Sequence, residues 1–400
     1  MNKINFKSFP ITKQYKCPNC DCAKKCSKVK VVRLLKKYPI TEFYRKKTEK
    51  FEKNAFFDQK IFFCEKYNHA FLEKILDTNL IYKFYHTKSS NSQGAVLALN
   101  SFYSFLKKSS KNLNKYNIVD IGGNDSTFLK IFKNNKEIKI NIDVNAVSNN
   151  KKIIAVRKPI EKIEKTDIPF LKNYKIYVSS NILEHLSDPS LLVKFIAKIS
   201  EEKDEIYFQF PCIEKMIELK KFDQICHQHI NYFSLYSINS LLMKNNLYIW
   251  DYEYDTSYFG MLRIKISKKK PKKLLKFKKQ ILYSKFKKSF SQFEEYYKIL
   301  NKNIENTYKN GQGFGAGLML PSTAYYLPVI NTLKYILDEN KQKINKKYLN
   351  LNPEIKSLRY LDKNKPVLIT SISTQEAGRQ IFKKLTNLGV KNITLPTYFS

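Results

Sequence analysis

Residues 116–127, with the sequence YNIVDIGGNDST, decide the fold because they read as a buried strand that runs into a glycine turn. Asn117–Ile121 is an apolar, mostly β-branched run of strand length. Gly122 and Gly123 permit the positive φ and the close backbone approach that a Cβ atom would forbid. A helix is expected to begin near Thr127. A strand, a glycine turn and a helix in this order typically receive a nucleotide-like ligand.

A second strand is expected at residues 138–142, and it ends in Asp143, about twenty residues after the turn. In a doubly wound sheet an acidic residue at this separation meets ribose hydroxyls, so the spacing suits an adenosyl cofactor. The glycines do not follow G-x-G-x-x-G, and no lysine follows them as in a P-loop. A nicotinamide or nucleoside-triphosphate ligand is therefore disfavoured. A glycine turn without any ligand is the alternative.

The composition describes a globular chain of two or three domains. Its 400 residues are 43% hydrophobic and 14% aromatic, which is ample for packed cores. Lys and Arg number 73 against 35 Asp and Glu, and the net charge of +38 admits nucleic acid as a partner. The excess is nearly all lysine and is spread along the whole chain, which disfavours a nucleic-acid groove and leaves a small-molecule enzyme open. The sequence shows no signal-peptide core and no membrane-length apolar run, so a cytoplasmic protein without membrane contact is expected.

The first segment carries cysteines at metal-ligand spacing. Cys17 and Cys20 form the C-x-x-C of KCPNC, which resembles a zinc knuckle, where two thiolates on one turn take adjacent corners of a tetrahedron. Cys64 is a natural third ligand, but Tyr67 stands where a second C-x-x-C would end. The fourth ligand would be one of Cys22, Cys26 and His69. A set of reduced thiols without zinc is the alternative.

Strands and helices alternate over residues 116–265, after a helical lead-in, which is typical of a parallel sheet with crossovers. We expect a strand at 176–180, a helix at Pro189–Ile199 and a strand at 205–210. The run KKKPKKLLKFKK indicates a linker, a long polar helix through Tyr308 follows, and a fresh α/β pattern begins at GQGFGAGLMLPS. The expected fold class is therefore α/β. The expected domains are 1–70, 71–266, the linker and helix 267–309, and 310–400.

Three of the five histidines are expected at one edge of the sheet. His185 lies beside Glu184 after the strand ending in SSN, and His227 and His229 lie in FDQICHQHINYFS after the next strand. The carboxyl ends of parallel strands meet at one edge, and imidazole titrates near working pH, so the pattern favours a proton-transfer site. The alternatives are a Glu-His pair that only caps a helix, and a metal site made from His227 and His229.

Six motifs together resemble the sugar C-methyltransferase family, and they occur in the expected order over almost the whole chain. They are VDIGGNDST, NILEHLSDP, FDQICHQHINYFS, SYFGMLRIKIS, GFGAGLMLPS and ILDENKQK. The resemblance implies an N-terminal zinc-binding module, a Rossmann-like class I methyltransferase domain that binds S-adenosylmethionine, and a C-terminal α/β domain. It also implies methylation of a nucleotide-linked sugar at carbon, next to a ketone.

The same resemblance implies roles for individual residues. His229 would be the base that removes the proton next to the ketone, and Tyr85 would close over the site. His227 and Gln228 complete the expected catalytic set. The expected cofactor-binding residues are Asp120, Gly122, Gly123, Asn124, Asp143, Asn181 and His185. The expected zinc ligands are Cys17, Cys20, Cys64 and Cys26.

The chain departs from the family pattern Tyr-His-Glu-His, because Cys226 and Gln228 replace the Tyr and the Glu. These changes remove a hydroxyl that could donate to the keto oxygen and a carboxylate that could raise the basicity of a histidine. Methylation of oxygen or nitrogen needs only a base and an aligned donor, so an O- or N-methyltransferase on a sugar or polysaccharide precursor is one alternative. A catalytically silent relative is another. The glycine-rich segment around Phe314 is expected either to bind the substrate's nucleotide or only to pack against the second domain.

Overall fold

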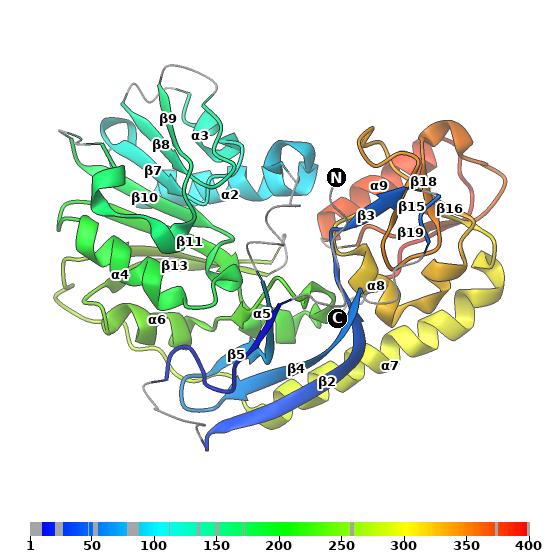
Figure 1. The fold of residues 1–400 in the computed structure, drawn as a ribbon, viewed down its shortest axis with the longest axis horizontal. Coiled ribbons are helices and arrows are strands. Elements are labelled where there is room, and N and C mark those ends of the chain that lie inside the picture. The colour runs from blue at the N-terminus through cyan, green and yellow to red at the C-terminus, as the bar shows by residue number, and fades with distance from the viewer. Residues whose placement is uncertain are drawn as a thin grey trace.

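The computed structural model contains two α/β halves joined by antiparallel strands (Figure 1). The described residues are 10–20, 27–46, 48–50, 55–77, 88–111, 113–133, 137–148, 152–169, 171, 173–256, 260–372 and 375–397. The first half, residues 88–267, lies on the left of Figure 1, and the second half, residues 310–397, lies on the right. The predicted α/β fold class is confirmed. Within the described ranges, no helix combines the length and the apolar character that crossing a bilayer requires.

The first half is built on a seven-stranded sheet. Its strands are β7 Asn117–Ile121, β8 Lys139–Ile142, β9 Ile153–Val156, β10 Lys175–Ser180, β11 Glu205–Pro211, β13 Tyr248–Asp255 and β14 Met261–Ser267. The order is β13-β14-β11-β10-β7-β8-β9. The five strands from β11 to β9 are parallel, as the alternation of strands and helices predicts. The prediction of a parallel sheet is wrong at one edge, where the hairpin of β13 and β14 pairs antiparallel with β11.

Helices cover both faces of this sheet. They are α2 Gln93–Ser109, α3 Thr127–Ile131, α4 Pro189–Ile199, α5 Ile213–Glu218 and α6 Leu235–Met243. α2 and α3 pack on the face that holds Ile118 and Val178, and α4 and α6 pack on the face that holds Val119 and Tyr177. Neighbouring residues of one strand thus serve opposite cores, as the two-residue period of a strand requires.

Helix α4 shows how the sequence sets the local structure. Asp188 accepts a hydrogen bond from the Ser190 N–H at 2.9 Å, and Pro189 occupies the first turn, where its missing N–H costs nothing. Leu192 and Ile196 follow at helical spacing and are fully buried. The predicted helix Pro189–Ile199 is confirmed at both ends.

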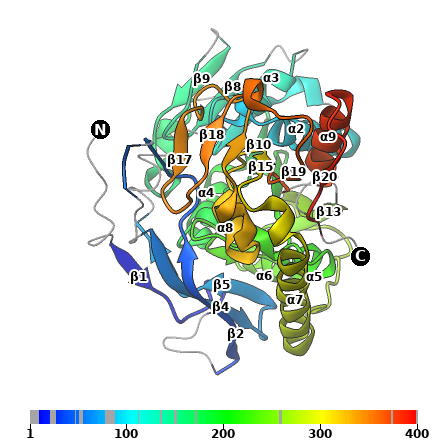
Figure 2. The same ribbon diagram turned by 90° about the vertical axis from the view of Figure 1, so that its right-hand side faces the viewer.

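The second half is a five-stranded parallel sheet that follows a long helix. The long helix is α7 Tyr283–Tyr308, and the elements of the second half are β15 Gln312–Phe314, α8 Leu320–Tyr326, β16 Tyr335–Leu337, β18 Glu354–Lys356, β19 Val367–Ile369, α9 Gln375–Asn387 and β20 Ile393–Thr394. The strand order is β18-β16-β15-β19-β20. The predicted polar helix through Tyr308 is confirmed. α7 lies beside α5 (Figure 2), and its Phe290 packs on Phe222, which ties the two halves together.

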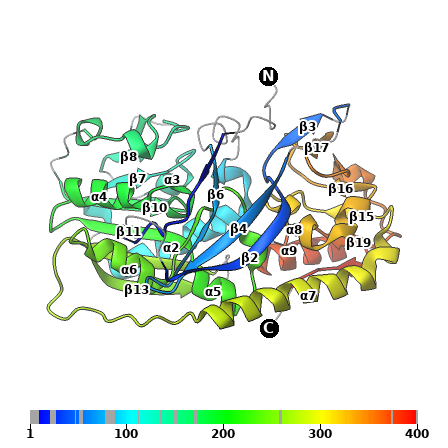
Figure 3. The same ribbon diagram turned by 60° about the horizontal axis from the view of Figure 1, so that its bottom comes forward.

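The N-terminal segment, residues 10–76, forms antiparallel strands that contact both halves. The strands are β1 Ile11–Lys13, β2 Val29–Pro39, β3 Tyr44–Lys46, β4 Phe56–Cys64, β5 His69–Leu72 and β6 Lys74–Leu76. β5 pairs with β12 (Asn231–Tyr232) of the first half, and β3 pairs with β17 (Lys346–Tyr348) of the second. β5 crosses residue 70, where the N-terminal module is predicted to end. β2 and β4 run from one half toward the other, above α7 (Figure 3).

Candidate active site

A cavity of about 790 Å³ lies between the two halves, at the carboxyl ends of β7 and β10. Six of the predicted site residues line it: Asp120, Gly122, Gly123, Asn181, His185 and His229. The facing wall consists of residues 314–319 with Asp338 and Lys343, and Glu42 reaches the cavity from the N-terminal segment. Four other predicted residues do not line it: Asn124, Asp143, His227 and Gln228.

The turn between β7 and α3 has the backbone conformation that the glycines were expected to allow. Gly122 has φ +85°, which L side chains rarely adopt. A Cβ atom at this position would lie 2.1 Å from Cδ1 of Ile182. The backbone of Gly122 therefore lines the cavity, while the space left by its missing side chain is occupied by Ile182.

Asp120 ends β7 at the cavity wall. Its Oδ2 is buried and has no hydrogen-bond partner among the described residues. Burial, assisted by the neighbouring carboxylate of Asp143, raises the pKa of Asp120 to about 8. Asp120 is therefore mostly protonated at neutral pH.

Asp143 follows β8, as predicted, but its carboxylate is used within the protein. Oδ2 accepts a hydrogen bond from the Asn124 N–H at 3.2 Å, and Oδ1 accepts one from the Asn145 N–H at 2.7 Å. The carboxylate of Asp143 thus holds the end of the glycine turn in place through its hydrogen bond with Asn124. Contact between Asp143 and a ribose stays a prediction.

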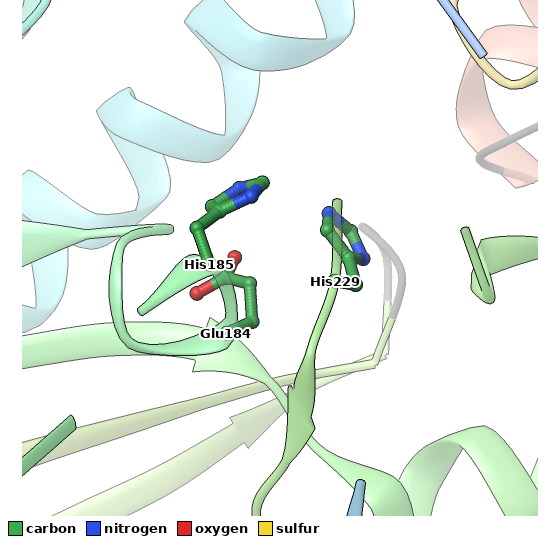
Figure 4. A group of neighbouring side chains, drawn as sticks. All are labelled: Glu184, His185 and His229. Atoms are coloured by element: carbon green, nitrogen blue, oxygen red, sulfur yellow. The ribbon is translucent and has the colours of Figure 1, made fainter. Parts of the chain in front are cut away.

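His185, His229 and Glu184 lie together at the cavity (Figure 4). The two imidazole centroids are 4.8 Å apart, with the ring planes at 78°. Nδ1 of His185 donates to the backbone oxygen of Gln228 at 3.0 Å. Nδ1 of His229 is buried without a hydrogen-bond partner in the described part of the chain. Burial and then the proximity of His185 lower the pKa of His229 to about 3, so its imidazole is neutral at neutral pH.

His227 and Gln228 turn away from the cavity and hold the N-terminal segment. Nε2 of His227 lies 3.1 Å from the backbone oxygen of Tyr38. The Gln228 side chain accepts a hydrogen bond from the Thr41 hydroxyl at 2.9 Å and donates one to the Thr41 backbone oxygen at 3.2 Å. The structure therefore does not bring these two predicted catalytic residues to the cavity.

Three of the predicted zinc ligands, Cys17, Cys20 and Cys64, lie in one buried cluster. A hydrogen bond with the Cys17 thiol lowers the pKa of Cys64 to about 6. These three thiols are not among the described groups whose ligand atoms all lie within 4.8 Å of one another, so a zinc site here stays a prediction. His69, an open choice for the fourth, has Nε2 3.2 Å from Oδ1 of Asn231. Three residues named in the predictions lie outside the described ranges: Cys22, Cys26 and Tyr85.

The facing wall repeats the arrangement of the first half. Gly315 has φ +99° directly after β15, and the Ala316 N–H donates to Oδ2 of Asp338, after β16, at 2.7 Å. The Asn124 N–H makes the same contact with Asp143 in the first half. The sequence predicts the glycine-rich turn as a candidate ligand-binding segment but does not predict a role for Asp338. An acidic residue at the end of the strand after a glycine turn is the signal that identifies it.

Glu42 is a cavity residue that the sequence analysis missed. It has φ 73°, which is unusual for a residue other than glycine, and its Oε2 has no hydrogen-bond partner among the described residues. Burial raises its pKa to about 7, and the charge of Lys343 opposes this shift. Lys343 itself donates to the Ala316 backbone oxygen at 2.6 Å. No local pattern marks Glu42, because its place depends on the pairing of β3 with β17.

The first half is similar in sequence and fold to known methyltransferases. Residues 91–252 match the family model described as a methyltransferase domain. Similar solved structures include the magnesium protoporphyrin IX methyltransferase of Synechocystis PCC 6803 with bound SAH, at 11% identity and a TM-score of 0.35, covering 44% of this chain and 83% of that one. Another is an S-adenosylmethionine-dependent methyltransferase from Mesorhizobium loti, at 10% identity and a TM-score of 0.34, covering 41% and 96%. No curated protein matches this sequence.

The matched region begins just before α2 and extends into β13, so it includes the glycine turn after β7 and the Glu184, His185 and His229 group. The family model and the open, mainly parallel sheet with helices on both faces together indicate a methyltransferase domain. Residues 91–252 thus correspond to a methyltransferase domain built on an open, mainly parallel α/β sheet.

Proposed function

We propose that the protein transfers a methyl group from S-adenosylmethionine to a nucleotide-linked sugar held in the cavity between the two halves. The observation that carries the proposal is the two-sided lining of the cavity. The glycine turn and Asp120 supply one wall for the cofactor. The second wall offers the backbone of a second glycine turn and the cation of Lys343, which suit the diphosphate of a nucleotide. A volume of about 790 Å³ lies in the range of sites for small organic ligands and cofactors.

His229 is the base in this proposal. Its Nδ1 is a buried ring nitrogen without a hydrogen-bond partner in the described chain, and it belongs to a neutral imidazole. Nδ1 takes the proton from the carbon next to the ketone, and the electron pair left behind forms an enolate. The enolate carbon attacks the methyl group in line with its bond to sulfur, and S-adenosylhomocysteine leaves with the electrons of that bond.

The positions of Cys226 and Gln228 affect whether carbon, oxygen or nitrogen of the substrate is the expected methyl acceptor. Both are buried and neither lines the cavity, so neither acts directly on a bound substrate. An enolate would then need its hydrogen-bond donors from other cavity groups, of which protonated Asp120 is one. Transfer to oxygen or nitrogen needs no such donor. O- or N-methylation of a related sugar is therefore the second candidate.

Nucleotide-sugar pools from cells with and without the gene test the proposed substrate. We expect one nucleotide sugar to gain the mass of a CH₂ group only when the gene is present. The ¹³C chemical shift of the new methyl group then separates attachment to carbon from attachment to oxygen or nitrogen. Calorimetric titration with S-adenosylhomocysteine tests the cofactor on its own. Folded protein that fails to bind it would contradict the central claim.

Replacing His229 by Ala tests the base. Turnover should fall by about 10²–10⁴-fold, the usual contribution of a general base. The affinity for S-adenosylhomocysteine should stay within about threefold, because the glycine turn is unchanged. A variant that keeps full turnover would place the base elsewhere.

A further inference from the structure

We propose that Glu184, His185 and His229 form a binding site for one divalent transition-metal cation. One carboxylate oxygen of Glu184 and one ring nitrogen of each histidine lie within 4.8 Å of one another (Figure 4). Ligands of such a cation sit about 2.0–2.2 Å from it, so two ligands on opposite sides are about 4 Å apart. A small side-chain adjustment would therefore bring all three atoms to one ion.

The buried atoms of the cluster give a second argument that is independent of spacing. Glu184 is only 1% exposed, yet its Oε2 has no hydrogen-bond partner among the described residues. Nδ1 of His229 is unpartnered in the same way. A buried polar atom without a partner costs about 1–3 kcal/mol. A cation held by both atoms would remove that cost.

Neighbouring groups orient the ligands as the outer shell of a metal site does. Nδ1 of His185 donates to the Gln228 backbone oxygen at 3.0 Å, which places the lone pair of the ring on Nε2. Nδ2 of Asn181 donates to Oε1 of Glu184 at 3.1 Å, which leaves Oε2 for the ion. Two imidazoles and one carboxylate with open positions are a set that suits Mn²⁺, Fe²⁺, Co²⁺ or Zn²⁺.

The site has a consequence that goes beyond the proposed function. Nδ1 of His229 cannot hold a proton and a cation at the same time. A loaded site therefore removes the base that the methyl transfer requires, and a chelator restores it. His185 and His229 line the cavity, so the remaining coordination positions of the ion would open toward it.

Electron paramagnetic resonance with Mn²⁺ tests the site on the full chain, without cofactor or sugar. Mn²⁺ favours carboxylate and imidazole over thiolate, so the buried cysteine cluster does not compete. We expect one bound Mn²⁺ per chain. Glu184→Gln keeps the shape of the side chain but removes the carboxylate that would bind the ion, and it should weaken binding by at least about tenfold. Glu214→Gln makes the same change at another buried carboxylate of the same half and should leave binding unchanged.

Circular dichroism shows whether each variant is folded, and His229→Gln supplies a second test if Glu184→Gln is not. Co²⁺, which binds such ligands more tightly than Mn²⁺, is the second probe. Absence of binding of both ions to the wild-type protein would overturn the proposal. Equal binding by the wild-type protein and the folded ligand variants would also overturn it. Because the titrations contain no cofactor or sugar, failure of the methyl-transfer proposal would appear only in the product analysis.

Discussion

The change of Gly122 to Ala adds one methyl group at the tightest point of the cavity wall. The new Cβ would lie 2.1 Å from Cδ1 and 2.2 Å from Cγ1 of Ile182. The left-handed backbone at φ +85° costs an L residue about 1–2 kcal/mol. Ile182 must also move, although it packs on the core of the first half, and overpacking of this kind costs about 1–3 kcal/mol. We expect the free energy of unfolding to fall by about 2–5 kcal/mol.

Gly389→Ala is the matched control for this change. Gly389 has φ +87°, and the nearest atom to its Cβ would be Cδ of Lys363 at 3.9 Å. This variant therefore carries the backbone cost without the steric one. The stiffening of the unfolded chain is the same for both Gly→Ala changes and cancels in their difference. Urea denaturation followed by circular dichroism should show Gly122→Ala to be less stable than Gly389→Ala by about 1–3 kcal/mol.

A double variant separates the contact from other effects at the turn. Trimming Ile182 to Ala in the Gly122→Ala background removes the atoms that the new methyl group meets. The two changes should then be non-additive, with the double variant recovering most of the steric part. Equal losses in Gly122→Ala and Gly389→Ala, or strict additivity with Ile182→Ala, would refute the view that Ile182 fills the space beside Gly122.

Two further predictions concern residues around the cavity. His227→Ala should lower the free energy of unfolding by about 1–3 kcal/mol, because the Tyr38 backbone oxygen loses its donor, while the folded variant should keep its turnover. A variant that loses kcat but keeps its stability would instead show that His227 takes part in catalysis. Glu42→Gln should raise stability by about 1–3 kcal/mol at pH 8 and by nearly nothing at pH 4, as measured by urea denaturation. The pKa of Glu42 is about 7 in the folded protein against 4.5 in the unfolded chain, so wild-type stability falls as the pH rises through this window, and Gln does not titrate. If the free energy of unfolding changed with pH in the same way for wild type and Glu42→Gln, the raised pKa of Glu42 would be contradicted.

The single elements of the first half could be predicted because their signals are local. Asn117–Ile121 is confirmed as β7 at both ends, and α4 begins at Pro189, directly after its Asp188 cap. β11 extends one residue beyond its prediction. Apolar spacing, a cap and a glycine turn each act within a few residues, so they can be read from the sequence without knowledge of the partners.

The composition of the candidate site could be predicted only in part, because it depends on pairing between distant segments. His227 and His229 are two residues apart, yet only His229 reaches the cavity, since β12 just beyond them joins β5 of the N-terminal segment. Glu184 joins His229 from a different loop, and Glu42 arrives from a third. Hydrophobic periodicity cannot predict these contacts, because they depend on strand pairing between residues that are far apart in the chain.

The pairing of β3 with β17 affects how the protein folds while it is being synthesised on the ribosome. β3 is made well before its partner Lys346–Tyr348, because the paired residues Tyr44 and Tyr348 are 304 residues apart in the chain. Until β17 is made the edge of β3 has no partner, and unpaired strand edges on a nascent chain invite association with other chains. β3 therefore stays unpaired while the intervening residues are made, so slower translation should lengthen the period in which it depends on chaperones.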